Sequence, residues 1–144
     1  MLIRVSSYSA AYSFNEVIRM SKKIIFIDKD NIEAWRALGS AYREKNLIHE
    51  SVAAYKKVFS LDPKDTEVCF DLGLTYFREG AFQRAAYYFE HIRSMGHGLD
   101  KSTESGLYNY AHQSLVMLQK CYEALGDLKK AEQMKREIGL YGGR

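Results

Sequence analysis

Apolar residues recur along most of the chain at the three- and four-residue spacing of helices that bury one face. Phe70, Leu74 and Phe77 share one such face, and the same spacing runs through Leu107, Ala111, Leu115, Leu118 and Tyr122. Proline, which interrupts helices, occurs once, at Pro63. The pattern therefore predicts an all-α protein.

A longer period lies above the helical one. Residues 35–42 (WRALGSAY) and 69–76 (CFDLGLTY) share Leu, Gly and Tyr when the chain is shifted by 34 residues. The same shift also superposes small or apolar residues: Ser51 on Ala85, Tyr55 on Phe89 and Val58 on Ile92. Such a period in an all-α chain indicates stacked helix pairs, which bury their apolar faces against one another.

These motifs resemble the tetratricopeptide repeat, a 34-residue unit with the pattern W-x2-L-G-x2-Y, then A-x3-F, then P. The first copy fills this frame with Trp35, Leu38, Gly39, Tyr42, Ser51, Tyr55 and Pro63. The second copy fills it with Cys69, Leu72, Gly73, Tyr76, Gly80, Ala85 and Phe89. The resemblance implies a right-handed α-solenoid of antiparallel helix pairs, with repeats at 32–65 and 66–99. Its glycines would let paired helices approach closely, and its aromatic side chains would fill the space between layers.

A degenerate third copy, with a C-terminal cap, is expected at 112–144. Leu118, Tyr122 and Ala131 keep the repeat spacing, but Gln119 replaces the packing glycine and Lys135 the aromatic residue. The copy is displaced by an insert at 100–111, which we expect to lengthen the first helix of the third pair. That helix should begin near Ser102 or Thr103, after a short loop around residues 96–98.

Residues 1–31 form an incomplete N-terminal pair in the same frame. The segment 21–28 (SKKIIFID) parallels 55–62 (YKKVFSLD), so it belongs to a second helix, with Ser13 and Glu16 as a capping box. Only twelve residues remain for the first helix, which is expected to be short or absent. Val17, Ile24 and Ile27 would then form an open edge for the first dozen residues or another subunit to cover.

Composition excludes several classes of protein. The 144 residues are 47% hydrophobic and 27% charged, which is typical of a folded globular chain. A net charge of +3, evenly spread, argues against nucleic acid or an anionic membrane as partner. No apolar stretch is long enough to insert across a membrane, and the N-terminus makes a poor signal peptide, so a cytoplasmic protein is expected.

Side chains that carry out chemistry do not form a recognisable site. Cys69 and Cys121 fall on apolar helical faces and are expected to be reduced core residues. The four histidines lack metal-ligand spacing, and no glycine-rich phosphate loop occurs in a strand–loop–helix context. We therefore expect no metal, no cofactor, no catalytic residue and no enzymatic activity.

The resemblance also implies where a partner would bind, because proteins of this family hold partners in a concave groove lined by the first helix of each pair. The corresponding groove residues are Arg36, Ser40, Arg43, Phe70, Leu74, Phe77, Val116 and Lys120. Members that clamp a terminal carboxylate use basic residues and asparagines at fixed groove positions. Here Ser40 and Asp71 depart from that pattern, which argues against carboxylate capture.

Two interpretations of Phe70 and Phe77 stay open. Either they form an apolar partner groove, or the long third-pair helix or the N-terminal segment covers them. The first reading predicts that Phe70→Glu abolishes partner capture with little loss of stability. The function expected is an adaptor that binds a peptide or helix of a partner protein. The alternative is a structural subunit of a self- or hetero-assembly, including a homo-oligomer, that uses the open N-terminal edge.

Overall fold

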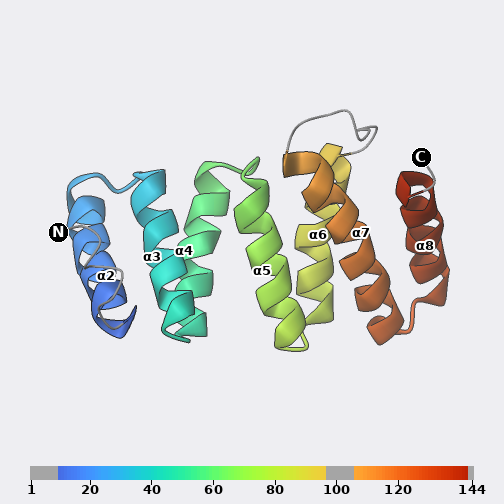
Figure 1. Ribbon diagram of the computed structural model, residues 1–144, viewed down its shortest axis with the longest axis horizontal. Coiled ribbons are helices and arrows are strands. Elements are labelled where there is room, and N and C mark those ends of the chain that lie inside the picture. Colours follow the sequence, from blue (N-terminus) through green and yellow to red (C-terminus); the bar gives the residue numbers. More distant parts are fainter. Residues whose placement is uncertain (1–9, 97–105, 143–144) are drawn as a thin grey trace. The chain divides into compact units, whose positions relative to one another are not determined.

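The computed structural model of the chain describes residues 10–96 and 106–142, and every element described is an α-helix (Figure 1). The chain divides into two compact units, Met1–Pro63 and Lys64–Arg144. The first unit contains α2 (Ala10–Ile27), α3 (Ile32–Glu44) and α4 (Ile48–Leu61). The second contains α5 (Thr66–Arg78), α6 (Phe82–Gly96), α7 (Gly106–Leu125) and α8 (Leu128–Gly142). The prediction of an all-α chain is confirmed.

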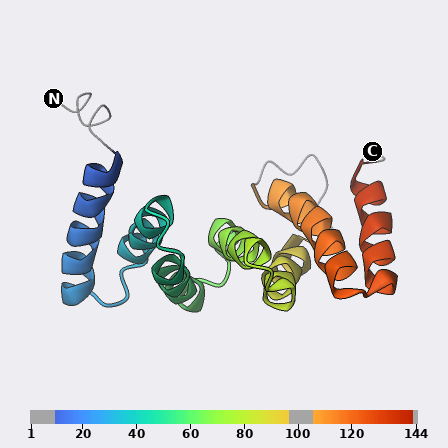
Figure 2. The same ribbon diagram turned by 90° about the horizontal axis from the view of Figure 1, so that it is seen from below.

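Helices that follow one another within a unit run antiparallel and pack side by side. In the first unit α3 packs against both α2 and α4. In the second unit α7 packs against α6, α8 and α5 (Figure 2). The contact of α7 with α5 brings two first helices of successive pairs together.

The first helices of the first two repeats begin with the same cap, one repeat apart. Asn31 Oδ1 accepts a hydrogen bond from the Ala34 amide at 2.9 Å, and Asp65 Oδ1 accepts one from the Val68 amide at 3.2 Å. These side chains satisfy amides that have no partner within their own helices. The helix starts therefore keep the 34-residue period of the sequence.

The turns within pairs depend on one residue with left-handed backbone. Asn46 has a φ of 63°, and Gly80 and Gly126 have φ of 79° at the equivalent positions of the next two pairs. Glycine adopts this conformation without strain, and asparagine tolerates it better than most residues. These positions end one helix and reverse the chain into the next.

Close approach of paired helices requires the repeated glycines. A Cβ atom on Gly39 would lie 2.7 Å from the ring of Tyr55, and one on Gly73 would lie 2.6 Å from that of Phe89. Both distances are well below van der Waals contact. In the third pair Gln119 and the exposed Lys135 replace the glycine and the aromatic residue together. Neither a glycine nor the ring that it accommodates is present there.

The predicted packing residues differ in how deeply they are buried. Those buried are Leu38, Gly39, Tyr55, Leu72, Gly73, Ala85, Phe89, Leu118, Tyr122 and Ala131. Trp35, Tyr42 and Tyr76 are half-buried. The Trp35 indole donates a hydrogen bond to the Lys29 carbonyl at 2.7 Å, and the Tyr76 ring stacks on Tyr88. Ser51, which replaces the usual alanine, donates to the Gly39 carbonyl at 2.8 Å, which satisfies its buried hydroxyl.

The insert lengthens α7, which has 20 residues whereas α3 and α5 have 13 each. The structure describes α7 from Gly106 onward, so residues 106–111 of the insert are helical. The expected start at Ser102 or Thr103 lies outside the described residues, as do residues 97 and 98 of the expected loop.

The predicted capping box of Ser13 and Glu16 is wrong. The helix α2 already begins at Ala10, so Ser13 lies inside it, and Glu16 pairs with Arg19 at 2.7 Å. Residue 12 is the equivalent of Asn46, but it is a tyrosine. Without a residue suited to left-handed backbone the helix continues through the position of the turn.

Candidate protein-binding surfaces

The first-helix face of the first unit carries the predicted groove residues of α3. Arg36, Ser40 and Arg43 are all half-buried. The Arg43 guanidinium lies 6.0 Å from the centre of the Tyr55 ring and 3.7 Å from a Glu44 carboxylate oxygen. Arg43 thus lies against its own repeat. The Glu44 carboxylate beside it weakens the positive potential that a partner would meet there.

Phe70 is not a groove residue, contrary to one of the two interpretations of the sequence. Only 9% of it is exposed, because α7 lies over it. Its ring centre is 5.4 Å from that of Tyr110 on α7 and 5.5 Å from that of Phe89 on α6. The added N-terminal turn of α7, which belongs to the insert, fills the place that a partner would otherwise take.

The other residues predicted for the groove keep part of their surface exposed. Leu74, Phe77 and Val116 are half-buried, and Lys120 is exposed. The Phe77 ring packs edge-on against Phe82 with ring centres 5.2 Å apart, so one side of it belongs to the contact between α5 and α6. Leu74 is then the apolar side chain of α5 best placed to meet a partner.

Negative charge surrounds the start of this face. Burial, followed by the carboxylates of Glu67, Asp71 and Asp65, raises the pKa of the Tyr110 phenol. A negative potential here disfavours the approach of a partner's carboxylate. The sequence argument against terminal-carboxylate capture stays a prediction.

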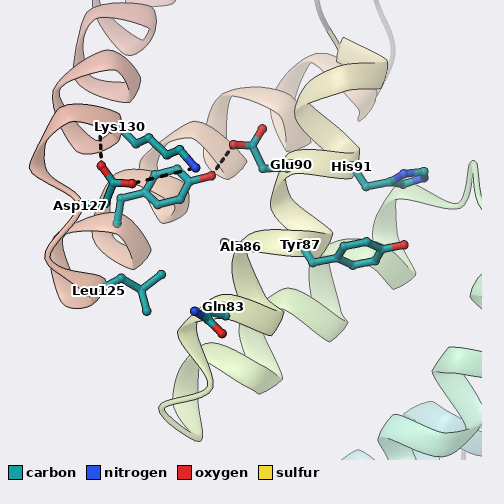
Figure 3. A pocket seen from close by; sticks show the side chains of 9 residues that line it. Gln83, Ala86, Tyr87, Glu90, His91, Leu125, Asp127 and Lys130 are labelled. Carbon is teal, nitrogen blue, oxygen red and sulfur yellow. Dashed lines mark hydrogen bonds and ion pairs between the residues drawn. The ribbon is translucent and has the colours of Figure 1, made fainter.

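A pocket of about 640 Å³ lies between α6 and the turn that joins α7 to α8 (Figure 3). It is lined by Gln83, Ala86, Tyr87, Glu90, His91, Tyr122, Leu125, Asp127 and Lys130. The Tyr122 hydroxyl donates to a Glu90 carboxylate oxygen at 2.5 Å. Lys130 lies 5.4 Å from the Tyr122 ring centre and 3.9 Å from an Asp127 carboxylate oxygen.

Ion pairs next to this pocket tie α6 to α8. The Arg93 guanidinium donates to Glu137 at 2.5 Å and to Glu90 at 2.9 Å, and these hydrogen bonds raise the pKa of Arg93. Glu90 therefore accepts hydrogen bonds from both Arg93 and Tyr122. The charged groups of the pocket are largely engaged with one another, so it is a polar clasp between helices. The repeat frame assigned only Tyr122 to packing and did not reveal the clasp, because Glu90, Arg93 and Glu137 lie outside the motif.

The two cysteines lie in the core, as the sequence predicted. Cys69 and Cys121 are free and buried, and burial raises the pKa of the Cys121 thiol to about 11, which keeps it protonated and unreactive. Within the part of the chain that the structure describes, no group of three or more His, Cys, Asp or Glu side chains could hold a metal ion. None of the described helices has the length and apolar character needed to cross a membrane.

Two solved structures share this architecture. Both are titled as crystal structures of MamA, and they superpose with TM-scores of 0.71 and 0.52 over 89% of this chain, at 20% and 21% sequence identity. The chain spans 63% of the first MamA chain and 92% of the second. At this level of identity the likeness shows the fold alone, which is an α-solenoid.

A family model described as a TPR repeat matches residues 39–80, the stretch that contains both packing glycines and the first two turns. This stretch of the chain is therefore a tetratricopeptide repeat segment. One relative is the general transcriptional corepressor trfA of Dictyostelium discoideum, which is 28% identical to this chain over 93 residues. The match covers 63% of this chain but 7% of the corepressor.

The tetratricopeptide repeats explain which surfaces stay open. Their family and fold indicate a module for protein–protein interaction. In the second unit Leu74, Phe77 and Val116 are each half-buried, whereas Phe70 lies in the core. Tyr110, which covers Phe70, was not foreseen as a site residue because the insert has no place in the repeat frame.

Proposed function

We propose that this chain is a non-catalytic adaptor that binds a peptide or helix of a partner protein on the first-helix face of its second unit. The apolar centre of this surface is Leu74, with the outer side of Phe77 and Val116, and Lys120 lies at its edge. One observation carries the proposal: α5 keeps Leu74 and Phe77 half-exposed although Val68, Cys69 and Leu72 already fill its buried face.

A helix that faces water on one side normally has polar residues there, so the apolar residues on the exposed side of α5 require an explanation. Leu74 and Phe77 lie at groove positions of the tetratricopeptide repeat, where the family binds its partners. The negative surroundings of Tyr110 favour a partner segment whose polar side chains are basic or neutral, and they disfavour a free carboxylate.

The test compares two leucine substitutions of equal chemistry. Leu74→Glu places a charge on the proposed surface, and Leu128→Glu places the same charge on α8, where Leu128 is exposed. Each tagged chain is used to capture proteins from an extract of its source cells, and captured proteins are quantified by mass spectrometry. We expect Leu74→Glu to capture a defined set of proteins in amounts at least about tenfold lower than the unchanged chain does. Leu128→Glu should capture the same proteins in unchanged amounts.

Thermal unfolding followed by circular dichroism is the control for both variants. The proposal predicts that each unfolds within a few degrees of the unchanged chain, because neither leucine is in the core. If Leu74→Glu folds and captures the same proteins in the same amounts, this face is not the binding surface.

A further inference from the structure

A second surface, on α2 of the first unit, points to a different partner. We propose that α2 docks an amphipathic helix of another protein whose apolar stripe is flanked by acidic residues. That helix would lie on α2 as the first helix of a complete pair lies on its second helix. This inference is independent of the surface proposed on α5.

The chain itself provides the comparison that identifies the vacant face. The helix α4 is the second helix of a complete pair, and α3 packs against it. Its side chains Ala54 and Val58 are 2% and 0% exposed. One repeat earlier, the equivalent residues of α2 are Met20 and Ile24, which are 52% and 41% exposed.

The same positions are also buried in the second unit. On α6 they are Tyr88 and Ile92, and both are buried between neighbouring helices. In α2 the packing on α3 accounts for Ser21, which is buried, but leaves Met20 and Ile24 uncovered. The exposed stripe on α2, continued by Ile27, is therefore the face that a paired first helix covers elsewhere in this chain.

The described chain does not turn back to cover this face. In the complete pairs the chain reverses at Asn46 or Gly80, where the backbone is left-handed. The equivalent residues 11–13 are part of α2, so the helix runs straight through the position of the reversal. A helix on this face has to come from outside the described residues.

The charges around the stripe indicate which charge a docked helix should carry. A shallow groove of about 480 Å³ adjoins the stripe at Ile27, and it is also lined by Arg19, Lys22, Lys23 and Phe26. Glu16 is the one acidic residue of α2, and Arg19 lowers its pKa through a side-chain hydrogen bond. Because Arg19 is paired with Glu16, Lys22 and Lys23 carry the net positive charge of this apolar surface. Such a surface complements a helix with an apolar stripe and glutamate or aspartate beside it.

A second copy of the chain fits this surface poorly. The helix α8 exposes Leu128 and Leu140 but has a net positive charge, with four basic residues (Lys129, Lys130, Lys135 and Arg136) against the acidic Glu132 and Glu137. Two α2 helices facing each other would likewise bring like charges together. Because like charges across an interface cost binding energy, both modes of self-assembly are disfavoured relative to an acidic partner.

The probes are two synthetic peptides as long as α3, which has 13 residues. Both carry the apolar residues of α3, and the polar positions are all glutamate in one and all lysine in the other. Binding to the full chain is measured by fluorescence anisotropy at low and high salt. We expect the glutamate peptide to bind, the lysine peptide to bind at least about tenfold more weakly, and salt to reduce the difference.

Substitutions then locate the binding. Met20→Glu should weaken the glutamate peptide about tenfold or more, because it adds a like charge and removes apolar contact. Lys23→Glu should weaken this peptide and strengthen the lysine peptide. Leu74→Glu, on the surface of the proposed function, should change neither, so the two proposals succeed or fail separately.

Three outcomes would overturn the inference. The first is that neither peptide binds, or that both bind equally. The second is a dimer in light scattering that Met20→Glu abolishes, which would make a second copy the occupant. The third is cosedimentation with phosphatidylserine vesicles that depends on Met20 while the glutamate peptide does not bind, which would make the occupant a lipid surface.

Discussion

At the scale of single residues, the fold depends on pairs of positions that lie sixteen apart in the sequence, such as Gly39 with Tyr55 and Gly73 with Phe89. The repeat motif shows each residue of such a pair by itself. The structure shows that the glycine is required because the ring lies against it. The same logic explains why the third pair tolerates Gln119.

Gly73→Ala should lower the free energy of unfolding by about 1–3 kcal/mol, because the added Cβ would lie 2.6 Å from the Phe89 ring. Gly139→Ala is the matched control, since it lies in α8 with nothing within 4 Å of an added Cβ. There the gain in helix propensity should stabilise the chain by up to about 1 kcal/mol. Urea unfolding followed by circular dichroism measures both changes, and equal effects of the two substitutions would contradict the close-approach argument.

Tyr122 should make stability depend on alkaline pH. Burial, and then the hydrogen bond to Glu90, raise its pKa above the usual 10.0. The folded chain then holds this proton more tightly than the unfolded chain. The contribution of the phenol is complete below pH 10 and is lost as the pH rises above it.

Tyr122→Phe removes both the hydrogen bond and the titration. At about pH 8 the variant should be less stable than the unchanged chain by roughly 1–3 kcal/mol, and this difference should shrink toward about pH 11. Urea unfolding at a series of pH values gives the two curves. A difference that stays constant over this range would show that the phenol does not titrate as described.

At the scale of helices, the insert changes the role of a neighbouring residue. By placing Tyr110 on Phe70, the added turn of α7 turns a groove position into core. Phe70→Ala should therefore cost about 3–5 kcal/mol of unfolding free energy. Phe26→Ala is the control, because that ring is exposed on α2 and its loss should change stability by less than about 0.5 kcal/mol.

Chemical denaturation of the two phenylalanine variants checks this prediction. The outcome that contradicts it is an equally small effect of both. In that case Phe70 would be free to contact a partner, as one interpretation of the sequence held.

The sequence predicted the helix pairs well and the site only in part. Leu38, Gly39, Leu72 and Gly73 locate their pairs because each copy repeats the same packing problem at a spacing of 34 residues. The burial of Phe70 could not be decided, since it depends on a ring 40 residues away in an insert with no repeat register. Cap signals also misled at Ser13, where the absence of a turn-forming residue outweighed a favourable local motif.

At the scale of the whole molecule, the two units differ in the size of their cores. Among the described residues, most of the large side chains that are fully buried belong to the second unit: Val68, Leu72, Phe89, Ile92, Leu115, Leu118 and Met134. In the first unit Val58 is the fully buried side chain of comparable size, and α2 is covered on one side by α3. The second unit has by far the larger core relative to its length.

Residues 64–144 should consequently fold as an isolated fragment, whereas residues 1–63 should be much less stable by themselves. A chain of this kind is stabilised by contacts between neighbouring repeats, so the unit with more buried neighbours keeps more of its stability. Circular dichroism and the sharpness of thermal unfolding distinguish the two fragments. A cooperative transition for 1–63 but not for 64–144 would reverse this ranking.

The pairing of Gly73 with Phe89 has a consequence for how such a chain can change over generations. Replacing a glycine that faces a ring is costly as a first step, because any side chain crowds the ring. Loss of the ring first releases the glycine, so mutations at the two positions have a favoured order. Among descendants of this chain, the repeats that have lost the glycine should already have lost the aromatic residue, as the third pair has with Gln119 and Lys135.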